Sequence, residues 1–172
     1  MHPGLLGFSV QYRKGANWSE YRLCQQFGSI TDLTRAEILK FVTDEMPHRA
    51  LGNACILLCG ETNGVKYSKA TKSVEDPFGL RRSIPKNVNV VLNPIHDRMT
   101  RFEMKLKRRF LSMGRRWTIS VWNKGRKDKN GRTRDGKEPA WTIFRSGKSM
   151  ESSVKMIEGP SGFEIGVIDV SQ

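Results

Sequence analysis

Cys59 is the residue of this chain whose surroundings best suit a nucleophile. It follows residues 54–58, an apolar run of the length of a buried strand, and it precedes Gly60 and Glu61. A thiol in such a place becomes a nucleophile when a base or a positive charge favours its thiolate form. Glu61 is the nearest acid–base candidate. The alternative is a cysteine that serves as a small buried hydrophobic residue, which is the commoner fate in an apolar run.

A second set of polar residues follows the next predicted buried strand, residues 88–92. Asn93 closes this strand, and His96 and Asp97 come soon after it. Functional residues collect at the carboxyl ends of strands in α/β sheets, so the two strand ends indicate one site. His96 and Asp97 would add a donor–acceptor pair to Cys59. For His96 the alternative is a histidine that caps a turn or faces solvent.

The elements that position these strand ends follow from periodicity and from capping signals. A capping box begins at Thr34 and Glu37, Gly114 is placed to stop the helix that follows residue 101, and residues 60–87 are expected to form a long loop with one helical turn. The other expected strands are 5–12, 117–122, 140–144 and 163–170, and the expected helices are 18–27, 34–45 and 101–113.

This order of elements predicts an α/β fold, with a layered mixed sheet and flanking helices. The length of 172 residues suits one domain with a sizeable core. Within it, we expect an N-terminal strand and helices in residues 1–50, a core in residues 54–147 and a tail strand in residues 148–172.

Five short motifs of the core resemble the later half of the carbon–nitrogen hydrolase (nitrilase) superfamily, in order and in spacing. They are Leu57-Leu58-Cys59-Gly60-Glu61, Val90-Val91-Leu92-Asn93-Pro94, Arg108-Arg109-Phe110-Leu111-Ser112, Ile119-Ser120-Val121-Trp122-Asn123, and Ala140-Trp141-Thr142-Ile143-Phe144 followed by Gly147. The resemblance covers about half of the chain, residues 54–147.

The resemblance implies a shortened αββα sandwich that hydrolyses a non-peptide C–N bond of a small amide or nitrile. Cys59 would be the nucleophile of a thioester-type intermediate, and Asn63, Asn93 and Asn123 would bind the substrate. The family's glutamate base and lysine lie upstream of the cysteine, and no upstream residue here has the family's sequence context. The candidates there are Glu20, Glu37, Glu45, Lys14 and Lys40. A reduced relative, a homo-oligomer that completes the site and a protein that has lost hydrolysis all remain open.

The charge of the chain supports a second hypothesis, a protein that binds nucleic acid or another polyanion, or an enzyme that acts on nucleic acid. The formal net charge is +13, and residues 98–137 contain 15 of the 30 Lys and Arg residues. Trp117, Trp122 and Trp141 lie near this segment, as in proteins that stack bases on aromatic rings, although core positions are the simpler expectation for them. The expected polyanion contacts are Arg101, Lys105, Arg108, Arg109, Arg115, Arg116, Lys124 and Arg126. A merely solvated basic surface is the alternative.

Several other classes of protein find no support in the sequence. Three cysteines are too few for a disulfide framework, the three histidines are scattered, and no phosphate-binding glycine motif occurs. We therefore expect no metal and no cofactor. Neither a secretory leader nor an apolar run of membrane-spanning length occurs, which leads us to expect a cytoplasmic protein without a membrane partner.

Overall fold

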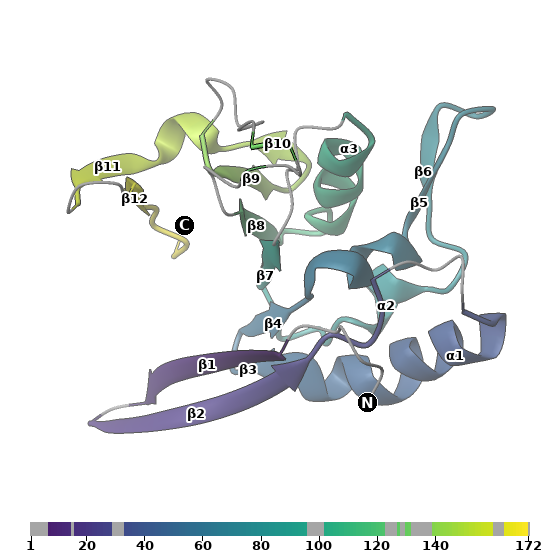
Figure 1. Ribbon diagram of the computed structural model, residues 1–172, viewed down its shortest axis with the longest axis horizontal. Coiled ribbons are helices and arrows are strands. Elements are labelled where there is room, and N and C mark those ends of the chain that lie inside the picture. Colours follow the sequence, from purple (N-terminus) through teal and green to yellow (C-terminus); the bar gives the residue numbers. More distant parts are fainter. Residues whose placement is uncertain are drawn as a thin grey trace.

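A six-stranded mixed sheet forms the centre of the computed structural model, in the order β10-β9-β8-β7-β4-β3 (Figure 1). The structure describes residues 7–14, 16–28, 33–95, 102–122, 127, 130–131, 139–159 and 164–171. The six strands are β3 (Ala50–Leu51), β4 (Ala54–Ile56), β7 (Val90–Ile95), β8 (Trp117–Trp122), β9 (Trp141–Arg145) and β10 (Lys148–Ser149). The chain is thus of the α/β class, as the sequence predicts.

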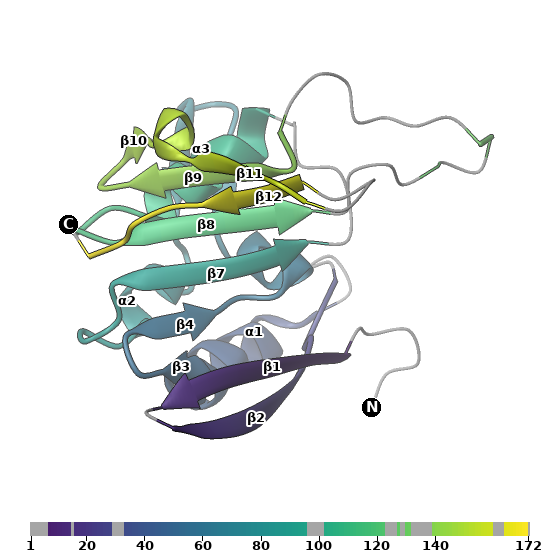
Figure 2. The ribbon, with the colours of Figure 1, turned by 90° about the vertical axis from the view of Figure 1, so that its left-hand side faces the viewer.

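The three central strands β4, β7 and β8 are parallel. β3 pairs antiparallel with β4, β9 with β8, and β10 with β9. Ala54 lies opposite Val90, and Val90 lies opposite Trp117. The carboxyl ends of the three strands therefore meet at one edge of the sheet, where their arrowheads point together in Figure 2. The strand end before Cys59 and the strand that contains Asn93 are neighbours, as expected from the sequence.

Helices cover one face of the sheet (Figure 2). They are α1 (Arg35–Lys40), the π-helix η1 (Phe41–Glu45), the 3₁₀ helices η2 (Met46–Arg49) and η3 (Cys59–Gly64), α2 (Leu80–Ser83) and α3 (Phe102–Leu111). Their apolar side chains meet those of β4 and β7 in the largest core cluster, which includes Phe41, Met46, Leu57, Val91 and Leu111.

Two hairpins lie over the opposite face of the sheet, β1 (Gly7–Lys14) with β2 (Asn17–Cys24), and β11 (Lys155–Glu158) with β12 (Glu164–Val167) (Figures 1 and 2). Leu23 of the first hairpin packs against Ile56 and Leu58. Val154 and Ile168, which flank the second hairpin, pack against the cluster around Trp117. Each hairpin thus covers a different part of the sheet. The short helix η4 (Glu151–Ser153) precedes β11.

Two local predictions are confirmed by the structure. Thr34 and Glu37 form the reciprocal capping box at the start of α1. Gly114 has φ +82°, a left-handed conformation that glycine adopts without a steric penalty, and it follows the end of α3. The turn at Ser146 and Gly147 joins β9 to β10, with φ of 49° and 80°.

Other elements differ from the sequence-based expectation. Residues 18–27 are not a helix, because Asn17–Cys24 pairs along its whole length with β1 and buries mainly Leu23. The expected loop at 60–87 contains η3, α2 and the hairpin β5 (Lys66–Ser68) with β6 (Ser73–Glu75). The tail strand has a partner, β11, that the pattern did not indicate. The strands among these elements are stabilised by pairing with another strand of the same hairpin, and local periodicity does not indicate which segments pair.

The apolar side chains of α3 face the core only in part. Phe102, Leu106 and Phe110 recur at intervals of four, which predicts one buried stripe. Phe110 is partly buried against the largest core cluster, but Phe102 is 66% exposed. The buried residues of α3 are Lys107, Arg108 and Leu111. No helix in the described part of the chain combines the length and apolar character needed to cross a membrane.

Candidate functional site

Cys59 lies where the chain leaves the central sheet. Hydrogen bonding to β7 continues past β4, since the Leu57 amide donates to the Leu92 carbonyl over 2.9 Å. The chain then turns into η3, which begins at Cys59 itself. The Cys59 side chain is partly exposed and packs against a small apolar cluster of Ile95, Trp122 and Met104. These three come from the ends of β7 and β8 and from α3, so Cys59 lies at the shared carboxyl edge of the sheet.

Asn93 links the strands and α3 below this edge. Its Nδ2 donates to the Leu57 carbonyl over 2.6 Å, while its Oδ1 accepts from Ser120 Oγ at 3.1 Å and from Arg108 Nε at 3.3 Å. Asn93 and Ser120 are both buried. The Asn93 side chain is therefore committed to holding β4, β7, β8 and α3 together, whereas the sequence suggested a direct contact of Asn93 with substrate.

Arg108 is the most unusual group of the site, because it is a charged side chain only 1% exposed. Nε donates to Asn93, but Nη1 and Nη2 have no hydrogen-bond partner among the described residues. Burial lowers the pKa of Arg108 to about 9, and the nearby Cys59 sulfur acts in the opposite direction. The guanidinium is therefore still charged at neutral pH. Asn93 links this charge to the Leu57 carbonyl, two residues before Cys59.

All three tryptophans named as possible base-stacking rings are buried. Trp117, Trp122 and Trp141 are each less than 9% exposed, so they are core residues and cannot stack on bases at the surface. Trp122 belongs to the Cys59 cluster, and its Nε1 is buried without a partner in the described part of the chain. The cluster around Cys59 is thus apolar apart from the Nε1–H donor of Trp122.

Glu61 is fully buried, and its carboxylate is engaged by the scaffold. Oε1 accepts from the Gln26 amide and from Arg49 Nη2, both over 2.9 Å, and Oε2 accepts from the Leu58 amide over 2.8 Å. Burial raises the pKa of the Glu61 carboxyl, which the Arg49 charge opposes. These contacts hold η3 to β2 and η2, so Glu61 positions the turn that carries Cys59.

Asn63 and Lys107 form a further polar contact at the far end of η3. Lys107 Nζ donates to Asn63 Oδ1 over 3.1 Å, and Asn63 Nδ2 donates to the Gly28 carbonyl over 3.2 Å. Burial lowers the pKa of Lys107. Lys107 and Arg49 were not among the site residues predicted from the sequence. Lys107 precedes the core residue Leu111 by four positions, and this spacing is the one signal that pointed to its face of α3.

The other predicted site residues divide between exposed, structural and undescribed positions. His96, Asp97, Asn123, Arg101, Lys124 and Arg126 lie outside the described residues. Arg109 and Arg115 are exposed and Lys105 is partly buried. Arg116 donates to the carbonyls of Val88, Arg81 and Ile84, so it joins segments of the scaffold. Upstream of Cys59, Glu20 accepts from Ser9 and Arg22, and Glu37 completes the helix cap.

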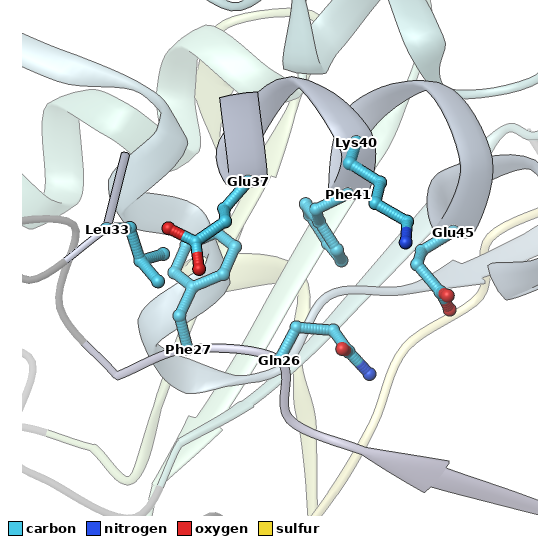
Figure 3. Close-up of a pocket in the computed structure, with 7 residues that line it drawn as sticks. All are labelled: Gln26, Phe27, Leu33, Glu37, Lys40, Phe41 and Glu45. Atoms are coloured by element: carbon cyan, nitrogen blue, oxygen red, sulfur yellow. The ribbon is translucent and has the colours of Figure 1, made fainter. Parts of the chain in front are cut away.

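A cavity of about 240 Å³ opens beside α1, and the residues that line it all lie upstream of Cys59 in the sequence (Figure 3). Its lining consists of Gln26, Phe27, Leu33, Glu37, Lys40, Phe41 and Glu45. The rings of Phe27 and Phe41 meet edge to face at 5.1 Å. Three candidates for an upstream acid or lysine, Glu37, Lys40 and Glu45, thus line this cavity. The residues that line this cavity do not include Cys59 or the residues of its apolar cluster, Ile95, Trp122 and Met104.

Comparison with known proteins gives no match: neither a family model, nor a curated protein, nor a solved structure matches this chain. Among the described residues, no group of three or more His, Cys, Asp and Glu side chains is arranged to hold a metal ion. The chemistry of the site is therefore argued from its own residues.

Proposed function

We propose that this chain is a small nitrilase-like hydrolase that cleaves the C–N bond of an amide or nitrile through Cys59. One observation carries the proposal: Cys59 lies at the carboxyl edge of three parallel strands, two residues after Leu57, whose carbonyl is linked through Asn93 to the buried guanidinium of Arg108. A positive charge next to a thiol favours the nucleophilic thiolate. The resemblance of the five sequence motifs to the carbon–nitrogen hydrolase family favours the same chemistry.

For an amide, the proposed reaction has two stages. The Cys59 thiolate attacks the carbonyl carbon, the tetrahedral intermediate collapses, and the C–N bond breaks as the nitrogen takes a proton and leaves as ammonia or an amine. Water then attacks the thioester carbon, which releases a carboxylic acid and regenerates the thiol. The sequence leaves the base of this cycle open. His96 and Asp97, a donor–acceptor pair that follows the last residue of β7 in the sequence, are the candidates for it.

Changing Cys59 to alanine is expected to abolish hydrolysis while the fold is kept. We expect ammonia release from a panel of small primary amides and nitriles to fall by about a thousandfold or more, because no other group replaces the sulfur nucleophile. Cys24→Ser is the matched control, since Cys24 is exposed on β2 and should be dispensable. Ammonia release at the same rate in Cys59→Ala, with an unchanged circular dichroism spectrum, would contradict the proposal.

Polyanion binding is a second candidate function, which the net charge of +13 favours. The structure leaves Arg109 and Arg115 exposed for such contacts. If they contact phosphates, Arg109→Gln with Arg115→Gln should weaken binding of a single-stranded oligonucleotide. It should also reduce the slope of log affinity against log salt by about two. Fluorescence anisotropy over a range of salt concentrations measures this slope. An affinity that does not depend on salt would exclude this surface.

A further inference from the structure

The guanidinium of Arg108 is held in one orientation while two of its three nitrogens stay unused. Its Nε is bound to Asn93, and Asn93 is in turn fixed by Ser120 and by the Leu57 carbonyl. Nη1 and Nη2 have no partner among the described residues, although the side chain is only 1% exposed. A buried charged group without a partner is costly, so such donors imply an acceptor that arrives from outside.

The described acidic residues do not supply this acceptor. The two ion pairs in the described part of the chain are Arg22 with Glu20 and Arg49 with Glu61. Glu103, the acidic residue of α3, is exposed, and the cluster around Cys59 otherwise contributes Ile95, Trp122 and Met104. A positive fork in an apolar surrounding is best matched by a planar anion with two oxygens, which a guanidinium binds through two parallel hydrogen bonds.

We propose that Arg108 is the receptor for a carboxylate of the substrate, so that the Cys59 site takes small carboxylic acids whose reacting carbon lies a few bonds from the carboxylate. Asn93 sets the direction of the guanidinium through its hydrogen bond to Nε. The assignment of a substrate class rests on the proposed hydrolase function. The binding of a carboxylate beside Cys59 can be tested without it.

Alkylation of Cys59 by two closely matched reagents provides the test. The thiolate displaces iodide from the CH₂ carbon of either iodoacetate or iodoacetamide, forming a C–S bond as the C–I bond breaks. Only iodoacetate carries a carboxylate next to the reacting carbon. Cys24, which is exposed, is the internal reference. The rate ratio of the two reagents at Cys24 shows how far the net positive charge of the protein alone favours the anionic reagent. Burial raises the pKa of Cys55 to about 12, so that thiol stays protonated and unreactive at pH 8.

We expect the iodoacetate-to-iodoacetamide rate ratio to be about 10 to 100 times higher at Cys59 than at Cys24, as peptide mass spectrometry measures. In Arg108→Gln the two ratios should become equal. Arg115→Gln, which removes the same charge from an exposed position, should leave the preference intact. Equal ratios in the wild-type protein would overturn the proposal. A preference that survives in Arg108→Gln would equally overturn the assignment to Arg108.

A measurement on the wild-type protein alone covers the case in which Arg108→Gln does not fold. Propionate should slow the reaction of Cys59 with iodoacetamide and leave Cys24 unaffected, whereas neutral propionamide should protect neither. If propionate gives no protection, the carboxylate site is refuted. Carboxylate selectivity in a protein that hydrolyses no amide or nitrile would leave the site standing and refute the proposed hydrolase. Hydrolysis of an amide or nitrile without carboxylate selectivity would refute the carboxylate site and leave the proposed hydrolase standing.

Discussion

Glu61→Ala is expected to lower the free energy of unfolding by about 3–5 kcal/mol, the usual cost of removing one partner from a buried ion pair. The substitution leaves Arg49 charged and only 2% exposed. It also removes the acceptor of the Leu58 and Gln26 amides. Because domains are stable by about 5–15 kcal/mol, this loss would be a large share of the total stability. The midpoint of urea denaturation measures the change.

Glu20→Ala is the control for this experiment, because it also removes a glutamate from an ion pair with an arginine. Glu20 and Arg22 are exposed to solvent, where such pairs contribute little. The denaturation midpoint of Glu20→Ala should therefore stay close to that of the wild-type protein. If Glu61→Ala were equally harmless, the buried pair would not be what holds η3 in place.

Gly60→Ala is expected to cause the second large loss, through a steric clash directly after Cys59. A Cβ at this position would lie 2.4 Å from the Gly28 carbonyl oxygen and 2.5 Å from the Phe27 carbonyl oxygen. Both atoms belong to the backbone, which cannot move aside as a flexible side chain would. We expect a loss of about 1–3 kcal/mol, as for other overpacked sites, together with slower alkylation of Cys59 because its turn is displaced.

Gly28→Ala tests the same contact from its other side. A Cβ on Gly28 would meet Gln25 Nε2 at 3.7 Å, an ordinary van der Waals distance. This variant should therefore unfold at nearly the urea concentration of the wild-type protein. Equal stability of Gly60→Ala and Gly28→Ala would show that the segment 26–28 does not press against Gly60 in solution.

The sequence was sufficient to predict the centre of the sheet and the meeting of its strand ends. Residues 54–58 and 88–92 are apolar because both faces of their strands are covered, by helices on one side and by hairpins on the other. Parallel pairing then brings Cys59 and the carboxyl end of β7 to one edge, as predicted, although β7 continues two residues past its predicted end at Asn93. The capping box at Thr34 and the helix stop at Gly114 were predictable because each depends only on residues close by in the sequence.

The polar interior of the site could not be predicted in this way. Arg108 was expected at the surface because arginine is rarely buried, and its burial depends on Asn93, which lies 15 residues away in the sequence. Arg49 and Glu61 compensate each other in the same manner across 12 residues. A sequence shows the charge of each residue but not the distant partner that makes burial possible. The exposure of Phe102 follows from the burial of Arg108 on another face of α3.

Mass spectrometry of a trapped intermediate tests the central claim, that Cys59 is the nucleophile of a hydrolase. The protein would be mixed with an amide or nitrile from which it releases ammonia, quenched in acid within one turnover and digested. We predict that the peptide containing Cys59 gains the mass of the acyl group, and that Cys59→Ala shows no such adduct and releases no ammonia. Continued release of ammonia by Cys59→Ala, or an adduct on another residue, would contradict the account.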